Sequence, residues 1–425
     1  VSREHHFPMN FTFSFVIVLF QLGFVLSQTI PRNHFFYQSR KFLYDAGNDW
    51  QSLTIFGPIR YKSKPSGKNL NSFDYFNGQV GFNAGNESYS LYGYGHFKHN
   101  NYYGFFYPTF VKRADKNIQF NGSSNFINNQ DNHSGLGYEN SWAILQIGKG
   151  KENWGAGNDI QIALSNHSSS YNYFLLGSDY GRIRVRYIYG FLEKIENVNR
   201  YITARGLEYT NKRSLVIGFS ETVIYSGENR SFDIGYLNPI SSHLEIELNN
   251  RLNVVGDGNS NAVWQFHLDF LPAKNFRFSL NFLYDELVLD PDIQIGKENG
   301  KAFSSRMAYS PAISNKYLLT LYCSIINVGT PTFRHGMGTN NFIQSGRPLG
   351  WIRGSDGQEI CIGVNYFNYK NLITSFSFGI MEMGEESIIN RVFDPYEDYL
   401  EGKFPSGNVD KSYFFRAEIS YQWGM

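Results

Sequence analysis

Polar and apolar side chains alternate one by one along much of the chain, most clearly between Gly181 and Tyr189. There Arg182, Arg184 and Arg186 are separated by single apolar residues. Successive side chains of a β-strand point to opposite faces. This stretch therefore predicts a strand with one charged face and one aliphatic and aromatic face.

The same alternation recurs over most of the sequence. It predicts strands over residues 75–84, 88–97, 141–148, 158–165, 171–178, 181–192, 202–210, 214–225, 231–237, 242–251, 262–271, 276–285, 302–310, 316–326, 358–368, 372–381 and 411–423.

The length and chemistry of these runs favour a membrane barrel over a soluble fold. Many approach the roughly 9–11 residues of a tilted transmembrane strand, whereas strands of soluble proteins have about 5–6. Their apolar faces are rich in Phe, Tyr and Trp, and their polar faces carry charges that a sandwich core would not accept unpaired. We predict an all-β fold, a transmembrane antiparallel β-barrel of about 16–18 strands of the outer-membrane type. A soluble β-sandwich or solenoid is the alternative.

Two rows of charged residues are predicted to face the lumen. They are Arg182, Arg184, Arg186, Glu245 and Glu247. The rows carry opposite charges, so we expect them to neutralise each other across a polar lumen. A ligand track is the alternative interpretation of the Arg row.

Long and short connections alternate along the carboxyl-terminal half of the chain. Residues 327–357 and 382–410 form long connections, and residues 311–315 and 368–371 form short ones. Outer-membrane barrels pair long outer loops with short periplasmic turns. The alternation predicts a protein of the outer membrane of a Gram-negative bacterium, with its carboxyl terminus in the periplasm.

The amino-terminal region predicts a targeting signal. An uncharged, largely apolar run begins at Met9 and ends at Ser27. It is shorter than the roughly 20 apolar residues of a spanning helix, and its small last residue suits signal peptidase. We expect residues 1–27 to be upstream residues plus a signal peptide. Residues 28–71 are expected to be an irregular segment, periplasmic or forming first strands, and residues 72–425 the barrel.

Composition and charge exclude several classes of protein. Lys and Arg number 38 against 37 Asp and Glu, so the basic excess of a nucleic-acid binder is absent. Aromatic residues make up 17% of the chain, too many for a disordered protein. Cys323 and Cys361 are too few for a disulfide framework or a four-ligand zinc site, which leaves two unpaired side chains or one disulfide. We expect no nucleic-acid partner, no metal site and no cofactor.

Several segments, taken in order, resemble the capsule assembly protein Wzi family of outer-membrane barrels. The resemblance rests on Gly148–Gly157, Arg200–Glu208, Ile217–Tyr225, Tyr236–Pro239, Asp269, Tyr284–Asp290, Phe333–His335, Pro348–Gly350 and Gly354–Asp356. It implies a non-enzymatic, lectin-like surface protein that binds and retains capsular or extracellular polysaccharide. Outer-membrane lipid and the barrel assembly machinery are the further partners that it implies.

The long segment between Arg334 and Asp356 offers side chains suited to sugars. Aromatic faces stack on sugar rings, planar polar groups bind hydroxyls, and Arg makes bidentate contacts to acidic sugars. The candidate ligand-binding residues are Arg334, His335, Asn340, Arg347, Trp351, Arg353 and Asp356. The alternative is that they bond to one another and fold the loop over the barrel mouth.

Two functions remain for such a barrel. We expect no enzyme and name no catalytic residue, since the sequence contains no Gly-x-Ser-x-Gly motif. A polysaccharide-binding protein with its mouth closed by loops is the first function, and an outer-membrane porin or substrate channel is the alternative. Fold alone does not choose between them. The long loops and the family resemblance favour the first.

Overall fold

The computed structural model describes most of the chain. The described residues are 9–20, 41–46, 75–84, 88–113, 133–250, 260–285, 298–314, 316–396 and 402–423.

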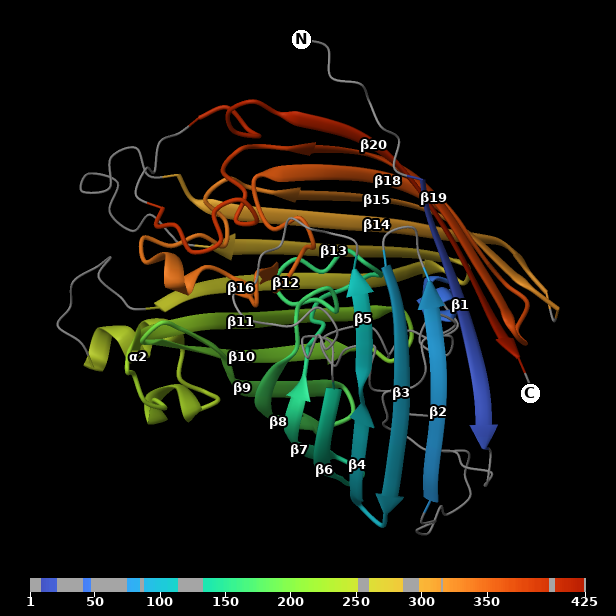
Figure 1. Cartoon of the computed structure of the whole chain (residues 1–425), viewed down its shortest axis with the longest axis horizontal. Coiled ribbons are helices and arrows are strands. Elements are labelled where there is room, and N and C mark those ends of the chain that lie inside the picture. The colour runs from blue at the N-terminus through green and yellow to red at the C-terminus, as the bar shows by residue number, and fades with distance from the viewer. Residues whose placement is uncertain are drawn as a thin grey trace.

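A single sheet of 18 strands curves into a barrel, and strands that follow each other along the chain lie side by side (Figure 1). Its strands are β1 (Met9–Phe20), β2 (Tyr75–Ala84), β3 (Ser88–His99), β4 (Tyr102–Tyr107), β5 (Thr109–Arg113), β6 (His133–Glu139), β7 (Ala143–Gly150), β8 (Tyr171–Asp179), β9 (Ile183–Ile195), β10 (Val198–Thr210), β11 (Leu215–Glu228), β12 (Ser260–Ala273), β13 (Phe276–Asp285), β14 (Gly300–Ile313), β15 (Leu318–Val328), β18 (Gly357–Phe367), β19 (Leu372–Met383) and β20 (Asp410–Trp423). The predicted all-β antiparallel barrel of about 16–18 strands is confirmed. A separate two-stranded hairpin, β16 (Ile343–Gln344) and β17 (Arg347–Pro348), lies in a loop.

Strands β4 and β5 are two halves of one path across the sheet. Both pair with β3, β4 along Gly95–His99 and β5 along Ser88–Tyr92. Pro108 stands between the two halves, and a proline has no N–H to donate to a ladder. The path therefore breaks at Pro108 and continues as β5.

Strand β1 closes the ring between the last and the second strand. It runs parallel to β20 and antiparallel to β2, so β2 and β20 run antiparallel to each other. If β1 is set aside and β4 and β5 are counted as one, 16 strands remain. Bacterial outer-membrane barrels have an even number of antiparallel strands. A chain without β1 can thus close by direct pairing of β2 with β20.

Strand β1 occupies the segment in which the sequence predicts a signal peptide. The predicted cleavage site after Ser27 lies outside the described residues, so cleavage stays a prediction. We expect the purified protein to begin at Gln28, and a chain of residues 28–425 to refold in detergent into a barrel that migrates differently on gels before and after heating. Edman sequencing and the gel shift check this. A mature protein that retains β1, or a shortened chain without the shift, would argue against closure by β2 and β20.

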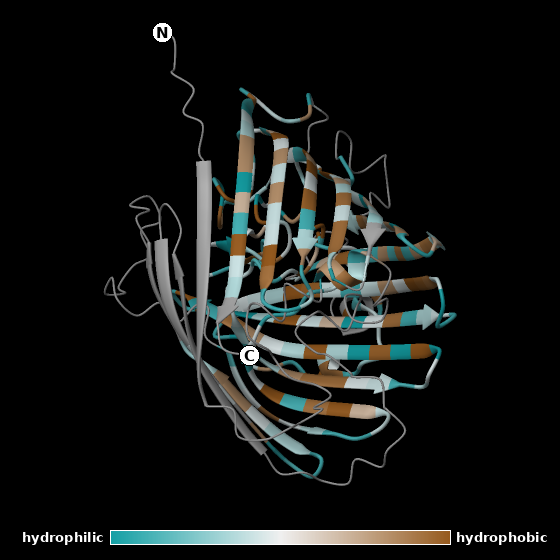
Figure 2. Cartoon of the chain, turned by 90° about the vertical axis from the view of Figure 1, so that its right-hand side faces the viewer, coloured by the Kyte–Doolittle hydropathy of each residue, from teal (hydrophilic) through white to brown (hydrophobic). Residues whose placement is uncertain are grey.

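Hydrophilic and hydrophobic residues alternate along many strands (Figure 2), and burial shows which of them face the outer wall and which the lumen. Leu207 and Phe219 are exposed on the outer wall, whereas their neighbours Glu208 and Ser220 are buried on the lumen side. Further exposed apolar residues of the strands are Leu136, Ile147, Phe174, Ile183, Phe266, Phe282, Met307, Leu321, Ile325, Ile360, Ile362, Phe376 and Phe378. An apolar outer wall around a polar lumen is the arrangement of a barrel in lipid.

Two predicted strands are helices. Residues 231–237 contain the 3-10 helix η2 (Ile234–Leu237), and residues 242–251 contain the α-helix α2 (His243–Asn250). Ser242 Oγ accepts a hydrogen bond from Glu245 N at 3.2 Å. This is an N-cap with the Ser-x-x-Glu spacing, which favours a helix start over a strand.

The predicted lumen-facing row of Glu245 and Glu247 is wrong, because the predicted strand over residues 242–251 is not a strand. Both residues lie on α2, in the connection between β11 and β12, and Glu245 is exposed there. They do not form a row on a barrel strand.

A third predicted strand, residues 158–165, is a loop segment inside the barrel. Strand β6, which precedes β7 in the sheet, was not among the predicted strands, because its Gly-rich sequence shows no clear alternation. In the described part of the chain, no helix has the length and hydropathy needed to cross a membrane. Cys323 and Cys361 are both free, so they form no disulfide.

The two ends of the barrel differ in the length of their connections. At the turn end, the strands are joined by residues 140–142, 180–182, 211–214, 274–275, 314–317 and 368–371. At the opposite end, called the loop end, the described parts of the longest connections are residues 151–170, 229–250, 329–356, 384–396 and 402–409. Strand β20 finishes at the turn end. That the turn end faces the periplasm stays a prediction.

Candidate functional site

The connection between β7 and β8, residues 151–170, enters the lumen from the loop end. Trp154 and Leu164 pair as an isolated antiparallel bridge, which turns the segment back on itself. The barrel wall binds its backbone, since Asn281 Oδ1 on β13 accepts a hydrogen bond from Ala156 N at 2.7 Å. The segment is therefore tied to the wall inside the barrel.

The connection between β15 and β18, residues 329–356, packs on this inner loop through backbone hydrogen bonds. Ser165 N donates to Leu349 O at 2.8 Å, and Trp351 N donates to Ile162 O at 3.3 Å. Two loops that are far apart in sequence are thus joined across the barrel mouth.

Gly350 lies where the two loops approach each other most closely. A Cβ atom at this position would overlap the carbonyl oxygen of Ile162. Ser165 Oγ also donates to Gly350 O at 2.5 Å. Because the obstacle is backbone, a residue with a side chain can stand at position 350 only if the loops separate.

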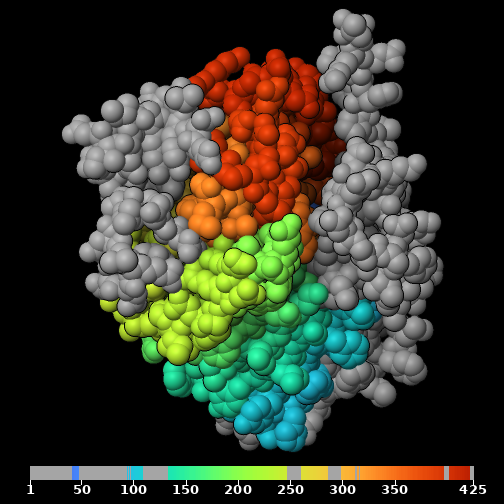
Figure 3. All heavy atoms as spheres, turned by 60° about the vertical axis from the view of Figure 1, so that its left-hand side comes forward, coloured from blue at the N-terminus to red at the C-terminus, as the bar shows by residue number. Residues whose placement is uncertain are grey.

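Apolar side chains of the loops and of the lumen wall form one buried core. The loop residues in it are Trp154, Ile160, Ile162, Ala163, Leu164, Phe333, Phe342, Ile343, Leu349, Trp351 and Ile388. The strand residues include Tyr173, Leu175, Ile188, Leu192, Ile202, Ala204, Ile224, Val263, Leu283, Ala302, Ile326 and Val328. Seen from the loop end, the orange and red atoms of the later loops are packed together over the middle of the barrel (Figure 3). Burial of apolar surface holds these loops in the mouth.

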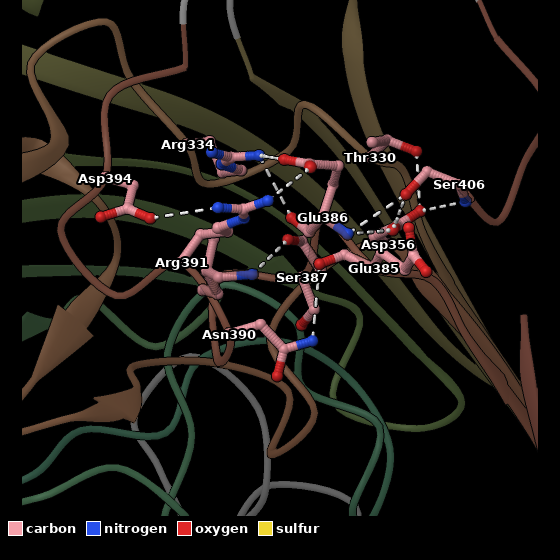
Figure 4. Close-up of polar contacts among 12 residues, drawn as sticks. Thr330, Arg334, Asp356, Glu385, Glu386, Ser387, Asn390, Arg391, Asp394 and Ser406 are labelled. Atoms are coloured by element: carbon pink, nitrogen blue, oxygen red, sulfur yellow. Dashed lines mark hydrogen bonds and ion pairs between the residues drawn. The ribbon is translucent and has the colours of Figure 1, made fainter. Parts of the chain in front are cut away.

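Asp356 joins three segments of the loop end (Figure 4). Its buried carboxylate accepts hydrogen bonds from Thr330 Oγ1 at 2.8 Å, Glu386 N at 3.0 Å and Ser406 N at 2.9 Å. Hydrogen bonds to an ionised group contribute about 1.5–3 kcal/mol each. Asp356 therefore holds the loop after β19 against the loop before β18.

Arg334 makes a second connection between the same two loops. Its guanidinium pairs with Glu386 at 2.5 Å and lies 4.4 Å from the ring centre of Tyr396. Burial raises the pKa of Tyr396 to about 12, so its ring stays neutral and attracts the cation through its π face.

Residues 41–46, which form a helical turn, fill the lumen from the turn end. Asp45 pairs with Arg306 on β14 at 2.7 Å, and the ring of Tyr44 lies 3.6 Å from the guanidinium of Arg277 on β13. Asn158 Nδ2 of the inner loop donates to Asp45 Oδ1 at 2.7 Å. The described part of the predicted irregular segment 28–71 thus lies inside the barrel and meets the inner loop.

The three Arg residues that were predicted to form one lumen-facing row have different surroundings. Arg184 pairs with Glu208 on the neighbouring strand β10, and Arg186 pairs with Glu152 of the inner loop at 2.7 Å. Arg182 precedes the strand and is exposed at the turn end. The two lumen-facing residues are therefore held in buried ion pairs rather than lining an open track.

The seven candidate ligand-binding residues differ in burial. Buried are Arg334, His335, Asn340, Trp351 and Asp356, and half-buried are Arg347 and Arg353. Arg334 and Asp356 bond to the loop after β19, and Trp351 packs in the core that the loops share, as the alternative interpretation of this segment expects. The side chain of Asn340 is buried without a hydrogen-bond partner among the described residues. The ring of Trp351 belongs to the buried core and presents no face for sugar stacking. Contact of Arg347 and Arg353 with a ligand stays a prediction.

Exposed polar side chains near this cluster come from the loop after β19, which was predicted as a long connection but contributed no residue to the candidate ligand-binding set. Asn390 is exposed, and the side chains of Arg391 and Asp394 are 46% and 60% exposed. Arg391 contacts Glu386 Oε1 at 3.3 Å and Asp394 Oδ2 at 3.5 Å (Figure 4). A loop without periodicity gives no sign in the sequence of which polar residues point outward.

Arg353 lies half-buried in the connection between β15 and β18. Burial, with Arg416 nearby, lowers the pKa of Arg353 from its ordinary value. Within the part of the chain that the structure describes, no three His, Cys, Asp or Glu side chains gather as metal ligands would. The groups available for binding are guanidinium, amide and carboxylate groups, which suit the hydroxyl and acid groups of sugars.

Comparisons with solved structures identify the fold. Wzi of Escherichia coli, an outer membrane protein involved in group 1 capsule assembly and described as a carbohydrate-binding β-barrel, matches with 15% sequence identity, 72% of this chain and 67% of that chain covered, and a TM-score of 0.53. At this identity the likeness shows the fold alone, a β-barrel of the outer-membrane type.

Other outer-membrane proteins match less closely. OmpT of Vibrio cholerae, in a form without loop L8, matches with 11% identity, 82% and 99% of the two chains covered, and a TM-score of 0.42. The outer membrane channel DcaP of Acinetobacter baumannii matches with 8% identity, 80% and 86% covered, and a TM-score of 0.42. The sequence matches no protein-family model and no curated protein.

Proposed function

We propose that the protein is a non-enzymatic outer-membrane barrel whose loop end faces outward and retains capsular or other extracellular polysaccharide on the cell surface. The single observation that carries this proposal is the loop end itself. Two loops joined by backbone hydrogen bonds fill the mouth, and a third loop is fastened over them through Asp356. A channel would keep a polar path through this region, whereas a binding protein gains a rigid surface.

The inner loop and the helical turn of residues 41–45 support the same proposal from inside the barrel. They meet through Asn158 and Asp45, so chain segments that enter from the two ends contact each other inside the lumen. The ion pairs of the wall, such as Arg306 with Asp45, are used to hold these segments. In a porin, such charges would instead line a water-filled path.

Half-buried and exposed groups of the loop end, together with the likeness to Wzi, support the proposed ligand class. Arg347, Arg353 and Arg391 place three guanidinium groups on the loop end, and Asn390 adds an amide. Guanidinium groups bind carboxylates in a bidentate manner, which suits a polymer of acidic sugars. Each sugar is expected to bind weakly, and repetition along the polymer raises the avidity.

A matched pair of triple variants tests the binding surface. Changing Arg347, Arg353 and Arg391 to Ala is expected to lower cell-bound polymer about tenfold or more, since each lost charged contact costs about 1.5–3 kcal/mol. The control changes the exposed turn-end residues Arg213, Lys316 and Lys370 to Ala, which removes the same charge from the other end.

Polymer on the cells and in the medium is measured, together with the amount of heat-modifiable barrel in the membrane. Normal retention by the loop-end variant, or equal loss in the control, would count against this surface. A single-channel recording of the unaltered protein in a planar bilayer tests the channel alternative. Steady steps of porin size would favour that alternative.

A further inference from the structure

The described part of the connection between β11 and β12 lies against the outer wall of the barrel rather than over its mouth. This wall segment, residues 229–250, contains η2 and α2. The buried residues in its contact with the wall are Tyr187, Tyr189, Tyr201, Val223, Tyr225, Tyr236, Ile246 and Ala262. In Figure 3, its yellow-green atoms lie on the flank beside the green strands, away from the red loops.

Outward-facing positions of β9 to β12 carry polar groups under this segment. On the outer wall, Arg205 and Glu221 form an ion pair at 3.0 Å, and Trp264 Nε1 donates to Glu221 Oε1 at 3.0 Å. An exposed ion pair on the lipid side of a barrel would be costly. The next outward positions on the same strands, Leu207 and Phe219, belong to the exposed apolar band.

The wall segment satisfies these polar groups with its own backbone. Tyr187 Oη donates to Tyr236 O at 2.7 Å, and Arg205 donates to Asn238 O at 3.2 Å. His243 N, at the start of α2, donates to Glu221 at 3.1 Å. Backbone groups of the segment thus face the barrel, beside the buried side chains of Tyr236 and Ile246.

The opposite side of the segment is apolar and exposed. Its exposed apolar residues are Phe232, Ile234, Leu237, Ile240 and Leu244, with Ile234 at 76% and Ile240 at 88% exposure. Between residues 231 and 246, all of which the structure describes, Glu245 is the one acidic or basic side chain in the exposed class. Large exposed apolar patches are uncommon on surfaces that face water, so these five side chains indicate an apolar environment.

We propose that this apolar side of the wall segment contacts the acyl chains of the membrane leaflet at the loop end. Continuity selects lipid as the occupant, because the patch extends the band of Leu207 and Phe219 along the same strands. The segment therefore widens the lipid-facing surface and covers the ion pair of Arg205 and Glu221. A second copy of the chain on the same patch is the other possible occupant.

A spin label distinguishes these environments in the full-length protein. Cys323 and Cys361 are replaced by Ala, and single cysteines are placed by Ile240→Cys or Ile234→Cys in the patch. Leu207→Cys on the band is the lipid reference, and Asn390→Cys at the loop end is the water reference. Each labelled barrel is reconstituted into phosphatidylethanolamine and phosphatidylglycerol vesicles, and its collisions with oxygen and with a water-soluble nickel complex are measured.

We expect the oxygen-to-nickel ratio at positions 240 and 234 to match that at 207 and to exceed that at 390 several-fold. Ratios like that at 390 would overturn the proposal. So would dipolar broadening that disappears on dilution with unlabelled protein, because a second copy would then cover the patch. Two patch positions keep the test valid if one variant does not fold. The proposal does not depend on polysaccharide binding, so a barrel that retains no polymer would leave it standing.

Discussion

Replacing Trp154–Leu164 with a Gly-Ser linker of equal length is expected to turn a closed barrel into a conducting one. The replaced residues supply much of the apolar core in the mouth, and among them Ile162 O accepts a hydrogen bond from Trp351 N. Without them, the wall ion pairs would line an aqueous path. Single-channel recording in a planar bilayer should show steady steps for the variant and none for the unaltered protein.

A point variant probes the same closure without removing chain. Gly350→Ala places a Cβ against the carbonyl oxygen of Ile162, and such overpacking costs about 1–3 kcal/mol. Short conducting bursts are therefore expected. Gly93→Ala is the matched control, since its Cβ would meet Pro108 Cγ at an ordinary contact distance of 3.4 Å. Silence of both the linker variant and Gly350→Ala would mean that other segments keep the mouth closed.

Replacing Arg277 with Met is expected to destabilise the barrel by about 3–5 kcal/mol, because it leaves a buried carboxylate without its cation. Arg277 and Asp269 pair at 3.2 Å, with side chains 1% and 3% exposed. The lost guanidinium also lies 3.6 Å from the ring of Tyr44. Urea unfolding in detergent, followed by loss of the gel shift, measures the change in free energy.

The double variant, Arg277→Met with Asp269→Leu, is the control for this prediction. Removing both charges leaves no uncompensated ion, so most of the lost stability should return. The difference between the double variant and the sum of the singles gives the coupling free energy. A double variant as unstable as the sum of the two singles would mean that the pair contributes through packing and not through charge.

The barrel itself could be predicted because its sequence signal is local. A strand with one face toward lipid and one toward a polar lumen must alternate, and the predicted strand 75–84 coincides with β2. The number of strands agrees with the prediction partly because three predicted runs that are not strands are offset by β1, β4, β5 and β6, which were not among the predicted runs. The outward position of Phe219 and the lumen position of Glu208 follow from the same rule.

Strand predictions from alternation were wrong where a segment leaves the sheet. Leu244, Ile246 and Leu248 alternate with polar residues, yet the N-cap of Ser242 and the contact of Ile246 with the outer wall favour a helix. Residues 158–165 alternate too, but their partners are loops and wall side chains rather than a neighbouring strand. Such contacts join residues distant in sequence, so no local pattern reports them.

The sequence indicated which residue types the candidate segment contains, but not which of those residues are buried. Sequence reasoning selected polar and aromatic residues in the connection between β15 and β18, which lies at the loop end. Asp356 and Trp351 are nonetheless buried by the loop after β19 and by the inner loop. Burial depends on how three loops fit together, which spacing along one loop does not reveal. The way in which the three loops fit together leaves Arg391 exposed and buries Arg334.

The helical turn of residues 41–45 is synthesised early, yet its partners come late. Asp45 and Arg306 are 261 positions apart, and Tyr44 must wait for Arg277 on β13. Contacts between residues so distant form slowly, because a long chain must be ordered first. The turn cannot take its place until β14 has joined the wall. We therefore expect the turn to enter the lumen only after β13 and β14 have formed, and a barrel stalled before that step would have a wall without this turn inside it.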